Sequence, residues 1–263
     1  ADYVRDLPLA LLGGGFLLFL ILFGRQKGVK TVLSLAVTCL VVFGLFFPLA
    51  VRGINPVWLS LLCAALMTGF TLFLVCGFTR KACSAILGCL GVLSVAGILA
   101  AVFSYAMRLS GIVDEEAAFL RFISDEFVLD FKGLLFAAII IGASGAAMDV
   151  AVSIASSLDE LAQKAPDLSA RQLFSSGVVI GRDIMGTMSN TLILAYVGGA
   201  IHLILLLYAY PVPFSHLINR ETVAAEILIA LCGSMGMLSA IPLTALISSL
   251  LHRRTAHFSG QIP

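Results

Sequence analysis

Charged residues are scarce in this chain, and motifs that bind nucleotides are missing from it. Asp, Glu, Lys and Arg make up 12% of the 263 residues, about half of the roughly 25% found in an average soluble domain. The net charge is only +1, so nothing in the composition suggests nucleic-acid binding, and we expect no nucleic-acid partner. No P-loop occurs and no GxGxxG motif precedes a predicted helix, so we expect no nucleotide and no ATP-driven work by this chain alone.

The cysteines and histidines lack the spacing of a redox or metal site. None of the six cysteines forms a CxxC pair, and the four histidines are scattered along the chain. All six cysteines lie in or beside apolar runs, where free thiols behave as small hydrophobic side chains. We therefore predict no metal and no cofactor.

Long apolar runs make up most of the chain. Hydrophobic residues account for 60% of it, and the mean hydropathy is +1.08. A helix of about 20 apolar residues crosses a bilayer, and only helices or closed barrels can do so. We predict one all-α polytopic transmembrane bundle, spanning the whole chain and embedded in a lipid bilayer. Its seven predicted spans are residues 7–23, 31–50, 57–78, 85–107, 133–155, 184–210 and 223–251.

The distribution of Lys and Arg predicts which loops face the cytoplasm. Alternate loops of a seven-span chain carry ten of these residues in one set and six in the other. Because cytoplasmic loops are enriched in Lys and Arg, the first set is assigned to the cytoplasm. The N-terminus is then outside and the C-terminus is cytoplasmic.

Two connections are longer than a turn. Residues 108–132 are external and acidic, and their Phe and Ile residues favour an amphipathic helix on the outer interface, with a solvated acidic gate for cations as the alternative. Residues 156–183 form a cytoplasmic segment. There Asp167 or Ser169 is expected to cap a short helix, which Ser175-Ser176-Gly177 interrupts before the sixth span.

Asp149 is the only ionisable residue between Gly133 and Ala155. A carboxylate at the centre of a bilayer costs about 2.5–3.5 kcal/mol on insertion scales, so it normally faces a partner, water or an ion. At 100° per residue it shares one helix face, about 80° wide. The small and polar residues on this face are Gly142, Gly145, Asp149, Ser153 and Ser156.

The sixth span opens with a second polar face. Its members are Asp183, Gly186, Thr187 and Asn190, with Arg182 beside them at the membrane edge. Asn190 and Asp149 each lie about 9 Å from the same cytoplasmic edge, because the fifth and sixth spans run in opposite directions. The sequence therefore predicts a buried polar cluster with an Asp149–Asn190 hydrogen bond. Asp149 is either a structural residue in this bond or a carrier of a proton or cation.

The seventh span carries small residues and one acid. Gly233 and Gly236 share a face with Glu226, as expected where another helix packs closely. Glu226 lies near the outer edge, so it either reaches the interface or forms a secondary polar site. Pro242 inside the span removes a backbone donor and is expected to kink the helix.

Three blocks of this sequence resemble a known family. The stretches GASGAAMDVAVSIASSLDEL and SSGVVIGRDIMGTMSNTLILAYVGG resemble its signature blocks, and GRQKGVKTVLSL is similar to its first cytoplasmic turn. By these blocks the chain is identified as a member of the YibE/F-like family of bacterial membrane proteins. The resemblance implies a multi-pass protein of the bacterial cytoplasmic membrane. Some members carry an additional extracytoplasmic N-terminal region, and two related proteins can occur together. Because this chain starts almost directly at its first predicted span, we expect it to match a short or trimmed form of the family.

Three functions remain for these polar groups. The first is a permease or channel-like transporter of a small solute or ion, coupled to protons or cations through Asp149 and Asn190. The second is a scaffold that binds another copy or a related family member through its small-residue faces. The third is an intramembrane hydrolase using Asp149 and Asp183, but these lie about 10 Å apart in depth. We expect the permease, with the scaffold as the alternative and no enzymatic activity.

Overall fold

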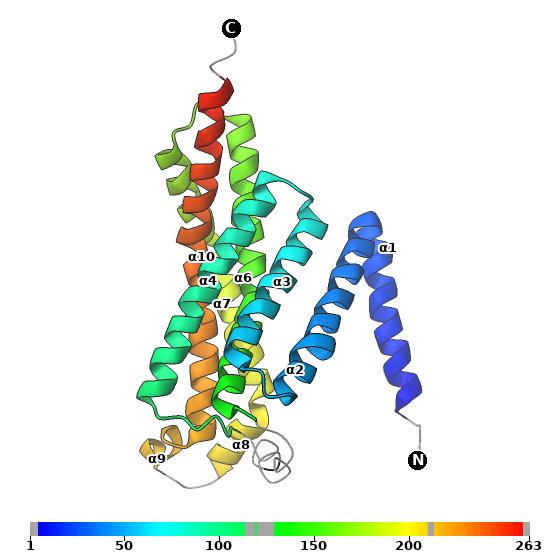
Figure 1. Cartoon of the computed structure of the whole chain (residues 1–263), viewed down its shortest axis with the longest axis vertical. Coiled ribbons are helices and arrows are strands. Elements are labelled where there is room, and N and C mark those ends of the chain that lie inside the picture. Colours follow the sequence, from blue (N-terminus) through cyan, green and yellow to red (C-terminus); the bar gives the residue numbers. More distant parts are fainter. Residues whose placement is uncertain (1–4, 114–118, 120–128, 210–212, 260–263) are drawn as a thin grey trace.

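The chain folds entirely into helices. The computed structural model describes residues 5–113, 119, 129–209 and 213–259. Helix accounts for 89% of the structure, and the described residues form no strand, in agreement with the predicted class. The helices in chain order (Figure 1) are α1 (Asp6–Cys39), η1 (Leu40–Phe46), α2 (Phe47–Val51), α3 (Pro56–Cys76), α4 (Arg80–Ala106), α6 (Phe131–Lys164), α7 (Ala170–Gly199), α8 (Ile201–Ala209), α9 (Phe214–Ile218) and α10 (Glu221–Ser259).

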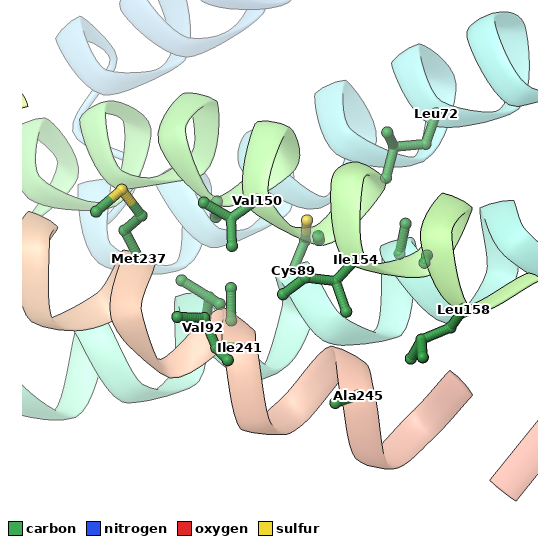
Figure 2. Packing of buried hydrophobic residues seen from close by; sticks show 14 of the residues in the cluster. Leu72, Cys89, Val92, Val150, Ile154, Leu158, Met237, Ile241 and Ala245 are labelled. Atoms are coloured by element: carbon green, nitrogen blue, oxygen red, sulfur yellow. The ribbon is translucent and has the colours of Figure 1, made fainter. Parts of the chain in front are cut away.

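Three long helices form the centre of the bundle. The helices α4, α6 and α10 pack against one another, α7 lies against α10 and α6, and α3 lies against α6 and α4. Small residues let the backbones approach closely, as is usual between helices in membranes. Figure 2 shows the cluster where four of these helices meet, with side chains of Leu72, Cys89, Val92, Val150, Ile154, Met237 and Ile241.

The N-terminal helices lie at the edge of this bundle. The α1 helix is interrupted at Arg25, whose φ of 48° and ψ of −125° are not helical. The chain reverses its direction at this interruption. Gly28 permits the close approach of the two arms, because a Cβ there would lie only 2.1 Å from the carbonyl oxygen of Leu20. The widened turns of η1 come just before Pro48, which has no N–H to donate to the preceding turn. Phe46 then packs with α3 and α6.

The number of membrane crossings depends on how bent helices are counted. Five described helices are long and apolar enough to cross, or six if the pair α7–α8, bent by 67°, is one span. The first of them, Asp6–Val51, has 46 residues. A straight helix of that length would be about 69 Å long, about twice a bilayer's hydrocarbon core. Its two arms instead point back from the bend (Figure 1). The predicted seven spans count these two arms separately. The number of spans and the assignment of loops to the cytoplasm stay predictions.

The connections alternate between the two ends of the bundle. The bend of α1, the α3–α4 turn and the α6–α7 turn lie at the upper end of Figure 1, where α10 also ends. The α2–α3 turn, α8 and α9 lie at the lower end. These are the two sets of loops that the Lys and Arg counts assigned to opposite sides. The predicted external helix falls mostly within residues 114–118 and 120–128, outside the described residues.

The segment between the fifth and sixth predicted spans differs from expectation. The α6 helix continues to Lys164, and a turn leads to α7, which Ser169 opens with a capping box to Gln172. The predicted break at Ser175-Ser176-Gly177 is wrong, because α7 is continuous from Ala170 to Gly199. Gly177 is buried there against neighbouring helices, and this packing offsets its low helix propensity.

One carboxylate fixes the loop that follows α4. Glu221, in the first turn of α10, accepts hydrogen bonds from the Ser110 amide, the Ser110 hydroxyl and the Gly111 amide through Oε1. The loop starts at Arg108, which has a left-handed φ of 53°. The lower end of the bundle is therefore tied together by polar contacts.

Candidate functional site

The polar stripe of α6 lies on the surface of the chain. Asp149, Gly142 and Gly145 are exposed, while Ser153 and Ser156 are half-buried. The opposite face of the same helix is fully buried in the core, at residues such as Ala147, Ala151 and Ile154. Helical periodicity therefore grouped these residues on one face, but that face is turned away from the bundle.

The hydroxyl of Ser153 in this stripe, and that of the adjacent Ser157, are satisfied within their own helix. Ser153 donates to the Asp149 carbonyl oxygen at 2.8 Å, and Ser157 donates to the Ser153 carbonyl oxygen at 2.9 Å. Among the described residues, none donates a hydrogen bond to the Asp149 carboxylate. The buried Cys89 thiol of α4 is close enough to interact electrostatically with that carboxylate. Asp149 is thus left available for water, an ion or another chain.

The α7 helix presents its apolar face to α6 and α10. A Cβ at Gly177 would lie 2.8 Å from both Leu158 and Ala245, and one at Gly181 would lie 2.2 Å from Ile241. Ile184, Met188 and Leu192 continue this face into the core cluster. The predicted polar residues lie on the other side of the helix and are all exposed: Arg182, Asp183, Gly186, Thr187 and Asn190.

The predicted Asp149–Asn190 hydrogen bond does not form within this chain. The two residues do lie at one level, because α6 and α7 run antiparallel and approach at Leu158–Gly177 and again at Gly142–Tyr196. Asn190, however, is about 160° around α7 from Met188, which packs into the core. Its amide therefore points away from α6. The polar groups expected in one buried cluster form two exposed faces instead.

Tyr196 is a residue of this region that the sequence reasoning did not single out. Its hydroxyl lies between α6 and α10, where a Cβ at Gly233 would be 2.7 Å away and one at Gly142 would be 3.8 Å away. The half-buried Glu226 of α10 interacts electrostatically with this phenol. The sequence does contain a signal for this contact. Tyr196 lies about two helical turns beyond Asn190, at the level of Gly142 on α6 and Gly233 on α10.

The sequence predicts helix-packing roles for Gly142, Gly145, Gly186, Gly233 and Gly236, and the environments of these glycines differ. Gly236 meets Ala96 of α4, where a Cβ would lie 2.9 Å from the alanine methyl, so it does serve a close helix contact. Gly145 and Gly186 would meet nothing within 4 Å. These two glycines keep the exposed faces of α6 and α7 flat, with room for another backbone or for water.

A second close contact joins α4 and α10. Gly88 faces Thr244, and a Cβ at Gly88 would lie 2.2 Å from the threonine hydroxyl oxygen. That hydroxyl is fully buried and has no hydrogen-bond partner among the described residues. Pro242 lies two residues earlier in α10, which continues through it as a single helix. This seam holds the central bundle against which α6 packs.

Comparison with known proteins gives one match. Within the described residues, no three His, Cys, Asp or Glu side chains are grouped so that they could hold a metal ion. No curated protein matches the sequence, and no solved structure matches it either. The sequence does match the family described as YibE/F-like protein over residues 12–254, which include α6, α7, the bend of α1 and nearly all of the bundle. The chain therefore belongs to the YibE/F-like family and is a multi-pass membrane protein.

Proposed function

We propose that the chain is a subunit of an oligomeric permease for a small solute or ion in the bacterial cytoplasmic membrane. Its path runs along the exposed α6 stripe that carries Asp149. The observation that supports this proposal is the exposure of Asp149 in a segment without other ionisable residues. A carboxylate facing hydrocarbon costs about 2.5–3.5 kcal/mol or more, so this face needs water or protein against it in the membrane.

A single copy of the chain offers only one wall of such a path. Asp149, Gly142 and Gly145 are exposed; a Cβ added at Gly145 would meet nothing within 4 Å, and one at Gly142 would meet only the Tyr196 hydroxyl, at 3.8 Å. A second chain seated on this face would close the path and shield the carboxylate from lipid. Asp149 would then bind a proton or cation between the two chains. If the second chain seats its exposed α7 face there, its Asn190 and Thr187 would supply further amide and hydroxyl ligands, since oxygen atoms suit hard cations.

The alternative is a scaffold in which the same stripe only joins two chains. Gly142 and Gly145 support this reading equally well, because small residues favour close helix association in membranes. We do not propose an enzyme: Asp149 and Asp183 lie on exposed faces of different helices, and a catalytic pair of carboxylates would have to approach within a few ångströms.

Flux measurements separate the permease from the scaffold. The full chain is reconstituted into proteoliposomes, and dissipation of imposed proton, Na⁺ and K⁺ gradients is followed with ion-sensitive dyes. Asp149→Asn removes the charge with little change in shape, and we expect it to abolish flux or its pH dependence. Asp167→Asn, at an exposed position in the α6–α7 turn, is the matched control and should behave as wild type. Unchanged flux in Asp149→Asn would refute the carrier role.

Crosslinking tests whether the stripe meets another chain. In a background lacking the exposed thiols of Cys39 and Cys83, Gly145→Cys should form disulfide-linked dimers in native membranes. Ile98→Cys, on the exposed face of α4, is the control and should remain monomeric. Dimers without flux would favour the scaffold. No dimers with Gly145→Cys would contradict an interface along this stripe.

A further inference from the structure

A pocket opens at the lower end of the bundle, away from the α6 stripe. It has a volume of about 380 Å³ and lies where the end of α4 meets the beginnings of α3 and α6. This volume is within the range of about 300–1,000 Å³ typical of small-ligand pockets. Its wall is mainly apolar, with Val57, Ala100, Ala101 and Phe136 contributing side chains.

Among the described residues that line the pocket, two are basic and one is acidic. Arg108 and Lys132 both line it, and both are exposed. The acidic residue there, Asp130, accepts a hydrogen bond from the Gly133 amide at 3.0 Å and so caps the first turn of α6. The Asp130 carboxylate, which already accepts a backbone hydrogen bond, therefore shares the pocket with two cations, Arg108 and Lys132. Arg and Lys are the side chains that bind phosphate oxygens, Arg through two parallel N–H donors and Lys as a point charge.

The pocket also has the arrangement of an interfacial site. Tyr105 lies on its rim with 88% of its surface exposed, and tyrosines of this kind are enriched where lipid meets water. With Tyr105 at the interface, the two cations would lie at headgroup level, and Ala101 and Phe136, which line the same pocket, would face an acyl chain. An amphiphile with an anionic head and an apolar tail matches both parts.

We propose that this pocket binds an anionic phospholipid. The phosphate lies between Arg108 and Lys132, and one acyl chain lies against Ala101 and Phe136. The site is distinct from the Asp149 stripe, and the proposal does not depend on the proposed transport function. The apolar wall distinguishes it from a site for free phosphate, which needs no tail.

Lipid retention tests the site. The full chain is placed in nanodiscs of phosphatidylcholine with a minority of phosphatidylglycerol, released into the gas phase, and the lipids that remain bound are counted by native mass spectrometry. Each basic residue near a membrane surface strengthens binding of anionic lipid several-fold. We expect wild type to retain phosphatidylglycerol preferentially, and Arg108→Gln with Lys132→Gln to lower that preference by about 30-fold.

The control pair is Lys27→Gln with Lys30→Gln, two exposed cations beside the bend of α1 at the other end of the bundle. It should retain the preference. If both pairs lower retention equally, the effect is nonspecific charge and the proposal fails. If the pocket pair retains phosphatidylglycerol as wild type does, it also fails.

A second variant guards against misfolding and tests the apolar wall. Ala101→Trp keeps every charge and fills the pocket, so it should also lower phosphatidylglycerol retention, while Ala101→Ser should not. Inorganic phosphate in excess should displace little lipid, because the tail contributes to binding. Retention that Ala101→Trp leaves unchanged, or that phosphate abolishes, would overturn the assignment to a phospholipid.

Discussion

The seam between α4 and α10 predicts a large cost for adding one methyl group at Gly88. A Cβ there would lie 2.2 Å from the Thr244 hydroxyl oxygen, 3.1 Å from its Cβ and 3.3 Å from its Cα. The hydroxyl oxygen is the main obstacle, and because Thr244 is fully buried, its side chain has no free space into which to turn. Overpacking of this kind costs about 1–3 kcal/mol, so we expect Gly88→Ala to destabilise the bundle by that amount.

Thermal unfolding of the detergent-solubilised chain, followed by circular dichroism at a fixed scan rate, measures the effect. Gly145→Ala is the matched control, because its methyl would meet nothing within 4 Å. Adding Thr244→Ala to Gly88→Ala removes the closest atom and should recover most of the loss, which gives a coupling energy in a double-mutant cycle. Equal stability of the two glycine variants, or no recovery in the double variant, would contradict a steric clash between Gly88→Ala and Thr244.

Three further predictions concern other contacts of the bundle. Gly181→Ala should destabilise α7 packing by about 1–3 kcal/mol, since its Cβ would lie 2.2 Å from Ile241, whereas Gly186→Ala should be neutral in the same thermal assay. Glu221→Ala removes the acceptor of three hydrogen bonds from the loop after α4 and should cost about 1–3 kcal/mol, seen also as faster amide exchange in that loop. Arg108→Gly removes the steric strain of a non-glycine residue in the left-handed region and should raise the free energy of unfolding in detergent by about 1 kcal/mol. The same change should lower phosphatidylglycerol retention. A lower unfolding temperature would contradict the first expectation.

The composition of the polar stripes could be predicted from periodicity, but their direction could not. A 3.6-residue repeat puts Asp149 with Gly142 and Gly145 on one face whatever surrounds the helix. In a soluble protein, hydropathy tells the inner face from the outer one. In a membrane the bundle interior and the surrounding lipid are both apolar, so hydropathy does not distinguish the inner face of a helix from the outer one. The buried faces of α6 and α7 are the apolar ones, and the stripe expected inside lies outside.

The error at α7 has a similar origin. Ser175-Ser176-Gly177 has low helix propensity, and a local reading therefore predicts a break. Tertiary contacts of Gly177 with Leu158 and Ala245 depend on the glycine and hold the helix continuous there. The Tyr196 hydroxyl between two helices was missed for the same reason, because its neighbours come from remote parts of the chain.

Hydropathy along the chain is enough to identify an all-helical multi-pass membrane protein with one acidic residue in an otherwise apolar segment. Helical periodicity is enough to identify the residues that share a face with Asp149. These properties depend only on hydropathy and helical geometry, which are local. The tertiary structure alone decided that this face is exposed, that Asn190 points away from it, and that Arg108 and Lys132 meet at one pocket. Those outcomes depend on which helices pack together, and small residues such as Gly88, Gly181 and Gly236 set that packing by where they let two backbones touch.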